Sequence, residues 1–206
     1  MKKKTIITIS RQFGSGGREV GQKLAEQLGI PFYDKELIER AAQESGYDKE
    51  LFEDADTRTS KGFHLLGALG YSLGGPISTI TELSLNDRLF LVQSQVVEAV
   101  ANEGPCVIVG RSADYVLKDR DDVLNVFIHA DMADRKERAV HSYEVDERDI
   151  ENSVRKIDKR RSNYYEYYTD RKWGNAENYD VCINTSTFGI DRCVSIIKAM
   201  IEGKEI

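Results

Sequence analysis

The chain has 206 residues, a formal net charge of −6 and 40% hydrophobic residues. This length suits a single domain over residues 1–206, because two full domains would each be left with a small core. The acidic balance disfavours general attraction to nucleic acid or to an anionic membrane. No apolar run reaches the ~18 residues that a membrane-spanning helix needs. From the charge and from the absence of such a run, we expect neither a nucleic-acid partner nor a membrane partner.

The cysteines favour a reducing compartment. Cys106, Cys182 and Cys193 are odd in number, lie far apart and lack metal-ligand spacing. We therefore expect three small buried side chains rather than disulfides or metal ligands. The apolar stretch near the start ends after Ile9 and lacks the small-residue cleavage site of a signal peptide. Both observations predict a cytoplasmic protein.

The first part of the chain predicts strands and helices in alternation. Thr5–Ile9 is a β-branched run typical of a strand, and residues 17–28 carry apolar side chains at helical spacing. Phe32–Tyr33 forms a short predicted strand. Asp34 follows this strand and can cap a second helix, which ends near Gly46.

Residues 47–84 are difficult to interpret, because Gly62–Ser78 is rich in Gly, Leu and Ser. The segment could form a mobile flap or a partner surface. It could equally be an irregular loop packed on the domain. The composition leaves these alternatives open.

The second half of the chain continues the alternation. An amphipathic helix over residues 85–103 precedes a buried-type strand, Cys106–Val109. The remaining predicted elements are a strand over Leu124–His129, a helix to Val140, a long polar helix over residues 147–168, a strand over Val181–Ile183 and a helix over residues 189–202. About five strands separated by helices predict an α/β fold, in which a parallel sheet has helices on both faces.

The glycine-rich stretch Ser10–Gly21 directly follows the first predicted strand and opens the first helix. Gly14, Gly16 and Gly17 allow a tight turn that points several backbone N–H groups at one anion. The helix N-terminus adds positive potential at the same point. Glycines also form ordinary turns, but this placement between strand and helix favours a phosphate-binding cradle.

The cradle departs from the common phosphate-binding pattern G-x-x-x-x-G-K-[ST]. Gly17 stands where lysine is expected, and Arg18 stands where a serine or threonine would hold Mg²⁺. Arg18 could supply the positive charge instead, because its planar fork suits phosphate oxygens. The alternative is that Arg18 is a solvated residue on the first turn of the helix.

Two further arginines are candidates for binding phosphate. Arg111 follows a strand end and a glycine, at the edge of the sheet where ligands of open α/β folds bind. Arg161 interrupts an apolar stripe on the long polar helix and could reach a phosphate if that helix closes as a lid. The alternatives are a surface ion pair for Arg111 and a solvated basic stripe for Arg161.

At these residues the chain resembles the cytidylate-kinase-like family, a branch of the nucleoside monophosphate kinases. The cradle from Ser10 to Arg18 is similar to the variant cradle of that family, and Ser112 stands where typical cytidylate kinases place an aspartate. The other segments that carry the resemblance, in the order expected for the family, are Phe32–Ile38, Val107–Ser112, Asp158–Tyr165 and Asp180–Ser186.

The resemblance implies a three-layer P-loop kinase fold with a five-stranded parallel sheet. It also implies a helical lid over residues 146–172 and makes residues 47–84 an insertion on the acceptor side. The implied activity is transfer of the γ-phosphate of ATP to a nucleoside monophosphate, with Mg²⁺. CMP and dCMP are the acceptors that the resemblance favours. A P-loop kinase for another small acceptor, or a nucleotide-binding regulator with little transfer activity, remains as an alternative.

These arguments together predict the residues of the site. The predicted partners are small-molecule nucleotides, a homo-oligomer is left open, and no residue is predicted as a direct metal ligand. The residues predicted to act in catalysis are Arg18, Arg111, Arg160 and Arg161. The residues predicted to hold the nucleotide are Arg11, Gly14, Ser15, Gly16, Gly17, Arg18 and Glu19. The residues predicted to hold the acceptor are Asp34, Arg58, Arg88 and Arg111.

Overall fold

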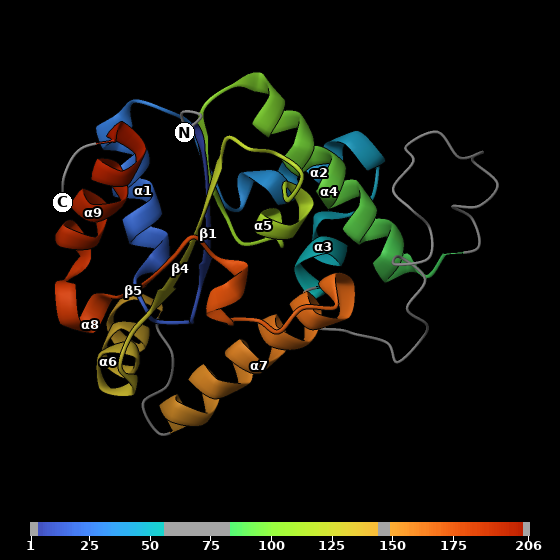
Figure 1. Ribbon diagram of the computed structural model, residues 1–206. Helices are drawn as coiled ribbons and strands as arrows, with labels where there is room; N and C mark the ends of the chain where they lie inside the picture. Colours follow the sequence, from blue (N-terminus) through green and yellow to red (C-terminus); the bar gives the residue numbers. More distant parts are fainter. Residues whose placement is uncertain (1–3, 56–82, 144–148, 204–206) are drawn as a thin grey trace.

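The computed structural model describes residues 4–55, 83–143 and 149–203 (Figure 1). Within these residues five parallel strands form one sheet in the order β2-β3-β1-β4-β5, which confirms the predicted parallel sheet. The order itself was not predicted, because strand neighbours depend on contacts that are distant in sequence. The strands are β1 (Ile6–Arg11), β2 (Phe32–Tyr33), β3 (Cys106–Val109), β4 (Val123–His129) and β5 (Val181–Asn184).

Helices cover both faces of the sheet, as the near-continuous apolar strands require. On one face α1 (Gly17–Leu28) and α9 (Ile190–Glu202) pack against the strands, with Leu24 and Ile197 in the core. On the other face lie α2 (Glu36–Ser45), α3 (Lys49–Ala55), α4 (Leu85–Glu103) and the short α5 (Ala113–Val116). Successive residues of β1 enter opposite cores, with Ile6 in the second and Ile7 in the first.

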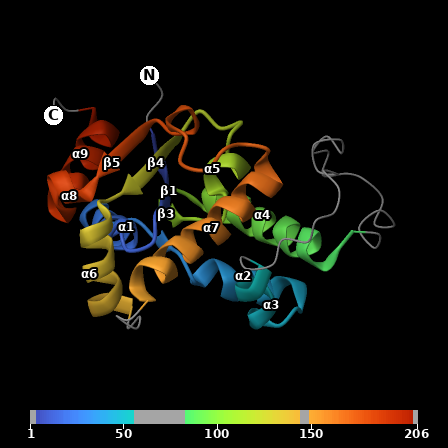
Figure 2. The same ribbon diagram turned by 90° about the horizontal axis from the view of Figure 1, so that it is seen from below.

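The remaining helices lie around the carboxyl ends of the strands. These helices are α6 (Met132–Tyr143), α7 (Ile150–Thr169), the short α8 (Thr185–Phe188) and a 3₁₀ turn over Ala176–Asn178. The views in Figures 1 and 2 show α7 running across this edge of the sheet. Because α1 and α4 lie on opposite faces, a crevice opens at the carboxyl ends of β1 and β3, where open α/β sheets bind ligands.

Two sequence predictions are wrong in detail. Asp34 does not cap α2, since the residue at the N-cap is Lys35 and makes no side-chain capping bond. The carboxylate of Asp34 instead accepts a hydrogen bond from Arg18. Cys106 and Cys193 are buried as expected, but Cys182 is exposed because it lies on the edge strand β5.

Some predictions cannot be compared with the structure. Arg58 and most of the 47–84 segment lie outside the described residues, so their acceptor-side role stays a prediction. In the described parts of the chain no helix combines the length and the apolar character needed to span a bilayer. The single domain, the cytoplasmic location and the oligomeric state also stay predictions.

Replacing Leu24 by alanine should lower the free energy of unfolding by about 3 kcal/mol, because the change leaves a cavity between α1 and the sheet. Leu24 is fully buried, whereas Leu85 is 38% exposed, so Leu85→Ala should change the same quantity by less than about 0.5 kcal/mol. Urea denaturation of both variants checks this. Equal losses would contradict the packing described for α1.

Candidate functional site

A cavity of about 610 Å³ opens at the carboxyl ends of β1 and β3. Among the residues that the structure describes, five cationic side chains and one carboxylate line it. Its charge therefore favours a polyanion, although the whole chain is acidic. The charged lining residues are Arg11, Arg18, Lys35, Arg111, Arg161 and the carboxylate Asp34.

The cradle between β1 and α1 forms one wall of the cavity. Gly14 and Gly16 have φ angles of 75° and 78°, left-handed values that favour glycine. Gly16 is the N-cap of α1 and provides no side-chain hydrogen bond to the first turn. The first N–H groups of any helix have no acceptor within that helix, so an anion in the cavity can accept from them.

Helix α6 holds the cradle from outside. Arg135 Nε donates to the carbonyl oxygen of Phe13 at 2.8 Å, and Arg138 Nη1 donates to the carbonyl oxygen of Gly14. A Cβ atom at Gly14 would clash with the carbonyl group of Arg135, so this approach requires glycine. With these carbonyls engaged on the outer side, the loop keeps its conformation before any ligand binds.

Two more elements fix the same loop. From α7, Asp158 Oδ1 accepts a hydrogen bond from the Phe13 amide at 2.7 Å, and the Asp158 carboxylate also pairs with the buried Arg135. From α8, Thr185 Oγ1 donates to the carbonyl oxygen of Ser15 at 2.7 Å. Residues from three distant parts of the chain therefore hold one short loop.

Asp34 lies opposite the cradle, where β2 ends. Its buried carboxylate accepts from Arg18 Nε at 2.7 Å, and a guanidinium nitrogen of Arg11 lies 3.9 Å from its other oxygen. The backbone of Asp34 is fixed as well, because its amide donates to Glu36 Oε2 at 3.0 Å. Asp34 thus brings two arginines of the cradle side and the start of α2 into contact.

The turn after β3 contains three successive residues with left-handed backbone. Gly110, Arg111 and Ser112 have φ angles of 76°, 57° and 49°. Such a conformation costs roughly 1 kcal/mol for each non-glycine residue. The turn places all three residues on the cavity wall, which supports the predicted position of Arg111 at the sheet edge. Strain of this kind is commonly found where a side chain must be aimed at a ligand.

Helix α7 forms the remaining wall. Arg161 Nη1 donates to the carbonyl oxygen of Arg11 at 3.1 Å, and the Arg161 guanidinium lies 5.6 Å from the centre of the Phe13 ring. Tyr164 and Tyr165 line the cavity beside it. Arg160 is exposed and does not line the cavity, because it points away from the stripe that carries Arg161.

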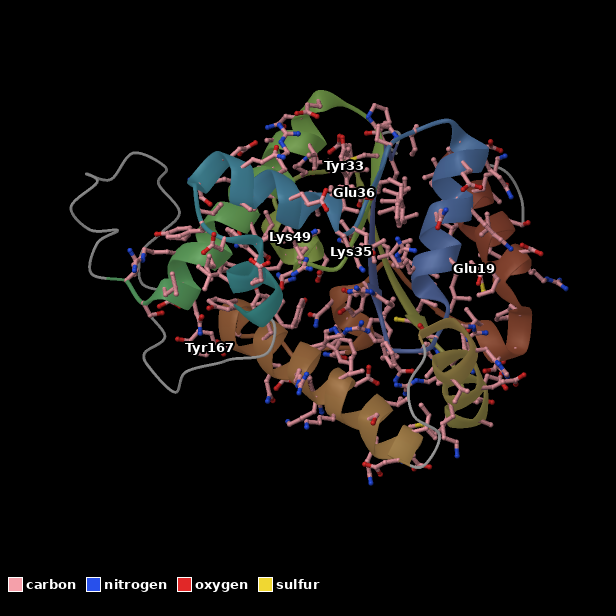
Figure 3. All side chains as sticks on the ribbon, turned by 180° about the vertical axis from the view of Figure 1, so that it is seen from behind. Glu19, Tyr33, Lys35, Glu36, Lys49 and Tyr167 are labelled. Atoms are coloured by element: carbon pink, nitrogen blue, oxygen red, sulfur yellow. The ribbon has the colours of Figure 1, made fainter. Side chains whose placement is uncertain are left out.

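The structure brings together most of the predicted site residues but leaves some apart. The predicted residues that line the cavity are Arg11, Gly14, Gly16, Gly17, Arg18, Asp34, Arg111 and Arg161. Ser15 is fully buried beneath the loop, and Arg88 on α4 is not part of the lining. Glu19 is exposed on α1 and pairs with Lys23; Figure 3 shows it on the side of α1 away from Lys35.

Several residues of the site went unnoticed in the sequence, Arg135, Arg138 and Asp114 among them. Arg135 and Arg138 lie on a polar helix and read as ordinary solvated side chains. Asp114 is buried in α5 and its Oδ2 accepts a hydrogen bond from the hydroxyl of Tyr165 at 2.6 Å. Burial raises the pKa of the Asp114 carboxyl, and burial next to that carboxyl raises the pKa of Tyr165. The sequence did offer a signal for Asp114, because this charged residue stands in a short, mostly apolar segment directly after Arg111.

Replacing Asp158 by alanine should lower the free energy of unfolding by about 3 kcal/mol, since it leaves the buried charge of Arg135 unmatched. The matched control is Glu151→Ala on the same helix, because Glu151 pairs with Arg155 at the surface. That exposed pair should contribute less than about 0.5 kcal/mol. Urea denaturation measures both; a loss in Asp158→Ala no larger than in Glu151→Ala would show that the pair does not hold the cradle.

The raised pKa of Asp114 predicts a pH effect with a definite sign. The folded protein holds this proton more tightly than the unfolded chain, whose aspartates titrate near pH ~4. Relative to Asp114→Asn, wild-type stability should therefore fall as the pH rises above ~4 and then level off. Tyr165→Phe removes a bond that lowers this pKa, so it should extend the fall. Urea denaturation from pH 4 to 8 tests this. If the free energy of unfolding of wild type rose with pH relative to that of Asp114→Asn, the prediction would be contradicted.

Comparisons with known proteins agree with this geometry. The chain is 29% identical over 204 residues to the cytidylate kinase of Pyrococcus horikoshii, covering 98% of this chain and 90% of that protein. A solved structure from Eubacterium ventriosum ATCC 27560, described as an uncharacterized protein, matches with a TM-score of 0.70 and 29% identity over 98% of this chain and all of the other. A shikimate kinase from Acinetobacter baumannii matches at a TM-score of 0.53 and 16% identity, over 98% and 95% of the two chains, and shares the P-loop kinase fold. The sequence pattern of the cytidylate kinase-like family matches residues 6–187, and the chain therefore belongs to that family.

Proposed function

We propose that this protein transfers the γ-phosphate of ATP to a nucleoside monophosphate, with CMP or dCMP as the first candidate. The observation that carries the proposal is the cavity itself, in which a glycine-rich cradle and a carboxylate on the opposite wall enclose a surplus of arginine charge. Membership of the cytidylate kinase-like family and the cytidylate kinase relative support the choice of acceptor class.

The cradle is the proposed site of the ATP phosphates. The open first turn of α1 and the left-handed glycines offer N–H groups to phosphate oxygens. The bonds from Arg135, Arg138 and Thr185 hold the loop in this shape beforehand, so little reorganisation is needed when the nucleotide binds.

The acceptor is placed on the opposite wall, between β2 and the turn after β3. Arg111 and Lys35 there can bind the phosphate of a monophosphate. Of the aromatic residues that line the cavity, Tyr164 and Tyr165 are buried, whereas the partly buried Trp173 offers ring surface to a nucleobase. The two phosphate groups would then face each other across the arginine cluster.

The donors of the cavity fit a magnesium ion that arrives with the nucleotide. Among the described residues no cluster of three His, Cys, Asp or Glu side chains could enclose a metal. Mg²⁺ commonly takes one or two carboxylates together with substrate phosphates and waters. To hold the ion, Asp34 would exchange its hydrogen bond from Arg18 for the metal, and the hydroxyls of Ser10 and Ser112 also line the cavity. The ion would neutralise charge on the phosphates.

Phosphoryl transfer requires the protein to position the two substrates and to neutralise the charge on the transferred group, rather than to form covalent bonds. A phosphate oxygen of the acceptor attacks the γ-phosphorus, and the bond from that phosphorus to the bridging oxygen of ADP breaks as the new bond forms. Arg161 is placed by α7 to neutralise the transferred group. Tyr165 and Asp114 fix the same helix one turn further on and keep Arg161 near the cradle.

A different small acceptor is the second candidate. Ser112 is buried in the turn beside Arg111, where typical cytidylate kinases place an aspartate, and the acceptor wall therefore differs in charge. A shikimate kinase shares this fold, which shows that the architecture accepts other acceptors. The departures in the cradle would equally suit a nucleotide-binding regulator, which would bind ATP in a calorimetric titration but form no ADP with any acceptor.

A coupled assay of ADP formation with ATP, Mg²⁺ and a panel of nucleoside monophosphates tests the proposal. We expect acceptor-dependent turnover with CMP or dCMP. Arg161→Met should lower kcat about a thousandfold, because one arginine on the transferred group can contribute that much. Arg155→Met is the matched control, since Arg155 lies on the same helix but is exposed and pairs with Glu151. No turnover with any monophosphate would refute the proposal.

A further inference from the structure

The missing cradle lysine has a steric explanation. Gly17 occupies the lysine position of the common pattern. A Cβ atom at Gly17 would lie 2.6 Å from Cβ and 3.1 Å from Cγ of Arg11, far inside normal contact. The stem of Arg11 therefore fills the space that a lysine stem would need. Any side chain at position 17 would have to displace it.

The other end of Arg11 depends on a second glycine. A Cβ atom at Gly110 would clash with Nη1 of Arg11 and lie 3.2 Å from its Cζ. Arg11 ends β1 and Gly110 follows β3, and the two strands are paired up to Ile9 and Val109, so both residues lie just beyond the end of the ladder. The side chain thus runs from the base of the cradle, past Gly17 and across Gly110, toward Asp34, whose nearest oxygen is 3.9 Å away.

We propose that Arg11 supplies the cradle charge that a lysine at position 17 ordinarily supplies, and that it binds the β- and γ-phosphate oxygens of the nucleotide. Arg11 and a lysine at position 17 are then mutually exclusive solutions to one electrostatic requirement. This inference rests on the nucleotide-binding part of the proposed function. It does not depend on which acceptor is phosphorylated.

Arg18 fits the role less well, although it stands next to the lysine position. Its Nε donates to Asp34 at 2.7 Å, so it is held more closely to the acceptor-side carboxylate than Arg11, which approaches Asp34 only to 3.9 Å. Its side chain is 44% exposed, against 22% for Arg11. The less exposed guanidinium acts in a lower dielectric, where its attraction for phosphate is stronger. The planar fork of Arg11 can also bind two phosphate oxygens at once.

Calorimetric titration with inorganic tripolyphosphate and with ATP tests the assignment. Arg11→Met should weaken binding of both about thirtyfold, the loss expected for charge-assisted hydrogen bonds. Arg18→Met should weaken it less than about threefold, and the exposed control Arg155→Met should leave it unchanged. Thermal denaturation establishes that each variant is folded. If Arg18→Met weakens tripolyphosphate binding more than Arg11→Met, the inference is overturned.

A charge swap makes the test sharper. Arg11→Gly should lose tripolyphosphate binding, and adding Gly17→Lys to it should recover at least about tenfold, because the two closest contacts of a Cβ atom at position 17, both with Arg11, are then removed and only the 3.2 Å contact with Cβ of Ile128 is left to relax. Gly17→Lys alone should lower the melting temperature, since its stem meets that of Arg11. A single Gly17→Lys variant as stable as wild type would refute the steric exclusion. A folded double variant that binds no better than Arg11→Gly would refute the transfer of charge.

The two proposals fail in different ways. If wild type phosphorylates no monophosphate but loses tripolyphosphate binding on Arg11→Met, the kinase proposal falls and the role of Arg11 stands. If wild type phosphorylates CMP and Arg11→Met binds ATP and tripolyphosphate as tightly as wild type, the role of Arg11 falls and the kinase proposal stands.

Discussion

The ion pair between Arg135 and Asp158 is the contact on which the candidate site depends. Both members also bond the backbone of Phe13: Arg135 donates to its carbonyl oxygen, and Asp158 accepts from its amide. A loop rich in glycine would otherwise sample many conformations, because glycine loses more backbone entropy than other residues on ordering. The pair joins α6, α7 and the cradle, so a movement of α7 is transmitted directly to the loop that faces the phosphates.

Charge is distributed unevenly in this molecule. The chain has a net charge of −6, yet in the part that the structure describes five cationic side chains and one carboxylate, Asp34, line one cavity. Two guanidinium groups approach that single carboxylate. The remaining positive potential of the cavity favours a polyanion, in contrast to the net negative charge of the whole chain. This pattern is consistent with a kinase of the cytidylate kinase-like family, to which the chain belongs.

Local sequence signals predicted the elements and much of the site. The helix over 85–103 and the strand Cys106–Val109 have the predicted bounds, because apolar periodicity and the breakers Gly104 and Pro105 act over a few residues. The glycine-rich turn of the cradle and the place of Arg161 on its helix were also predicted from patterns that extend over a few residues. Asp34 was assigned to a cap because its partner, Arg18, is visible only once β2 lies beside α1. Arg135 likewise has partners far away in sequence, so its burial has no local sign.

The interlocking of Arg11 with Gly17 and Gly110 restricts how this sequence can evolve. A lysine cannot enter at position 17 while the arginine stem occupies the space, and the arginine cannot leave first without losing a cation from the cavity. Any route that exchanges the two positions one substitution at a time thus passes through an intermediate in which position 17 is crowded or the cavity lacks a cation. Descendants of this chain should keep the three positions together or exchange them together, and homologues should fall into two discrete classes with few mixtures between them.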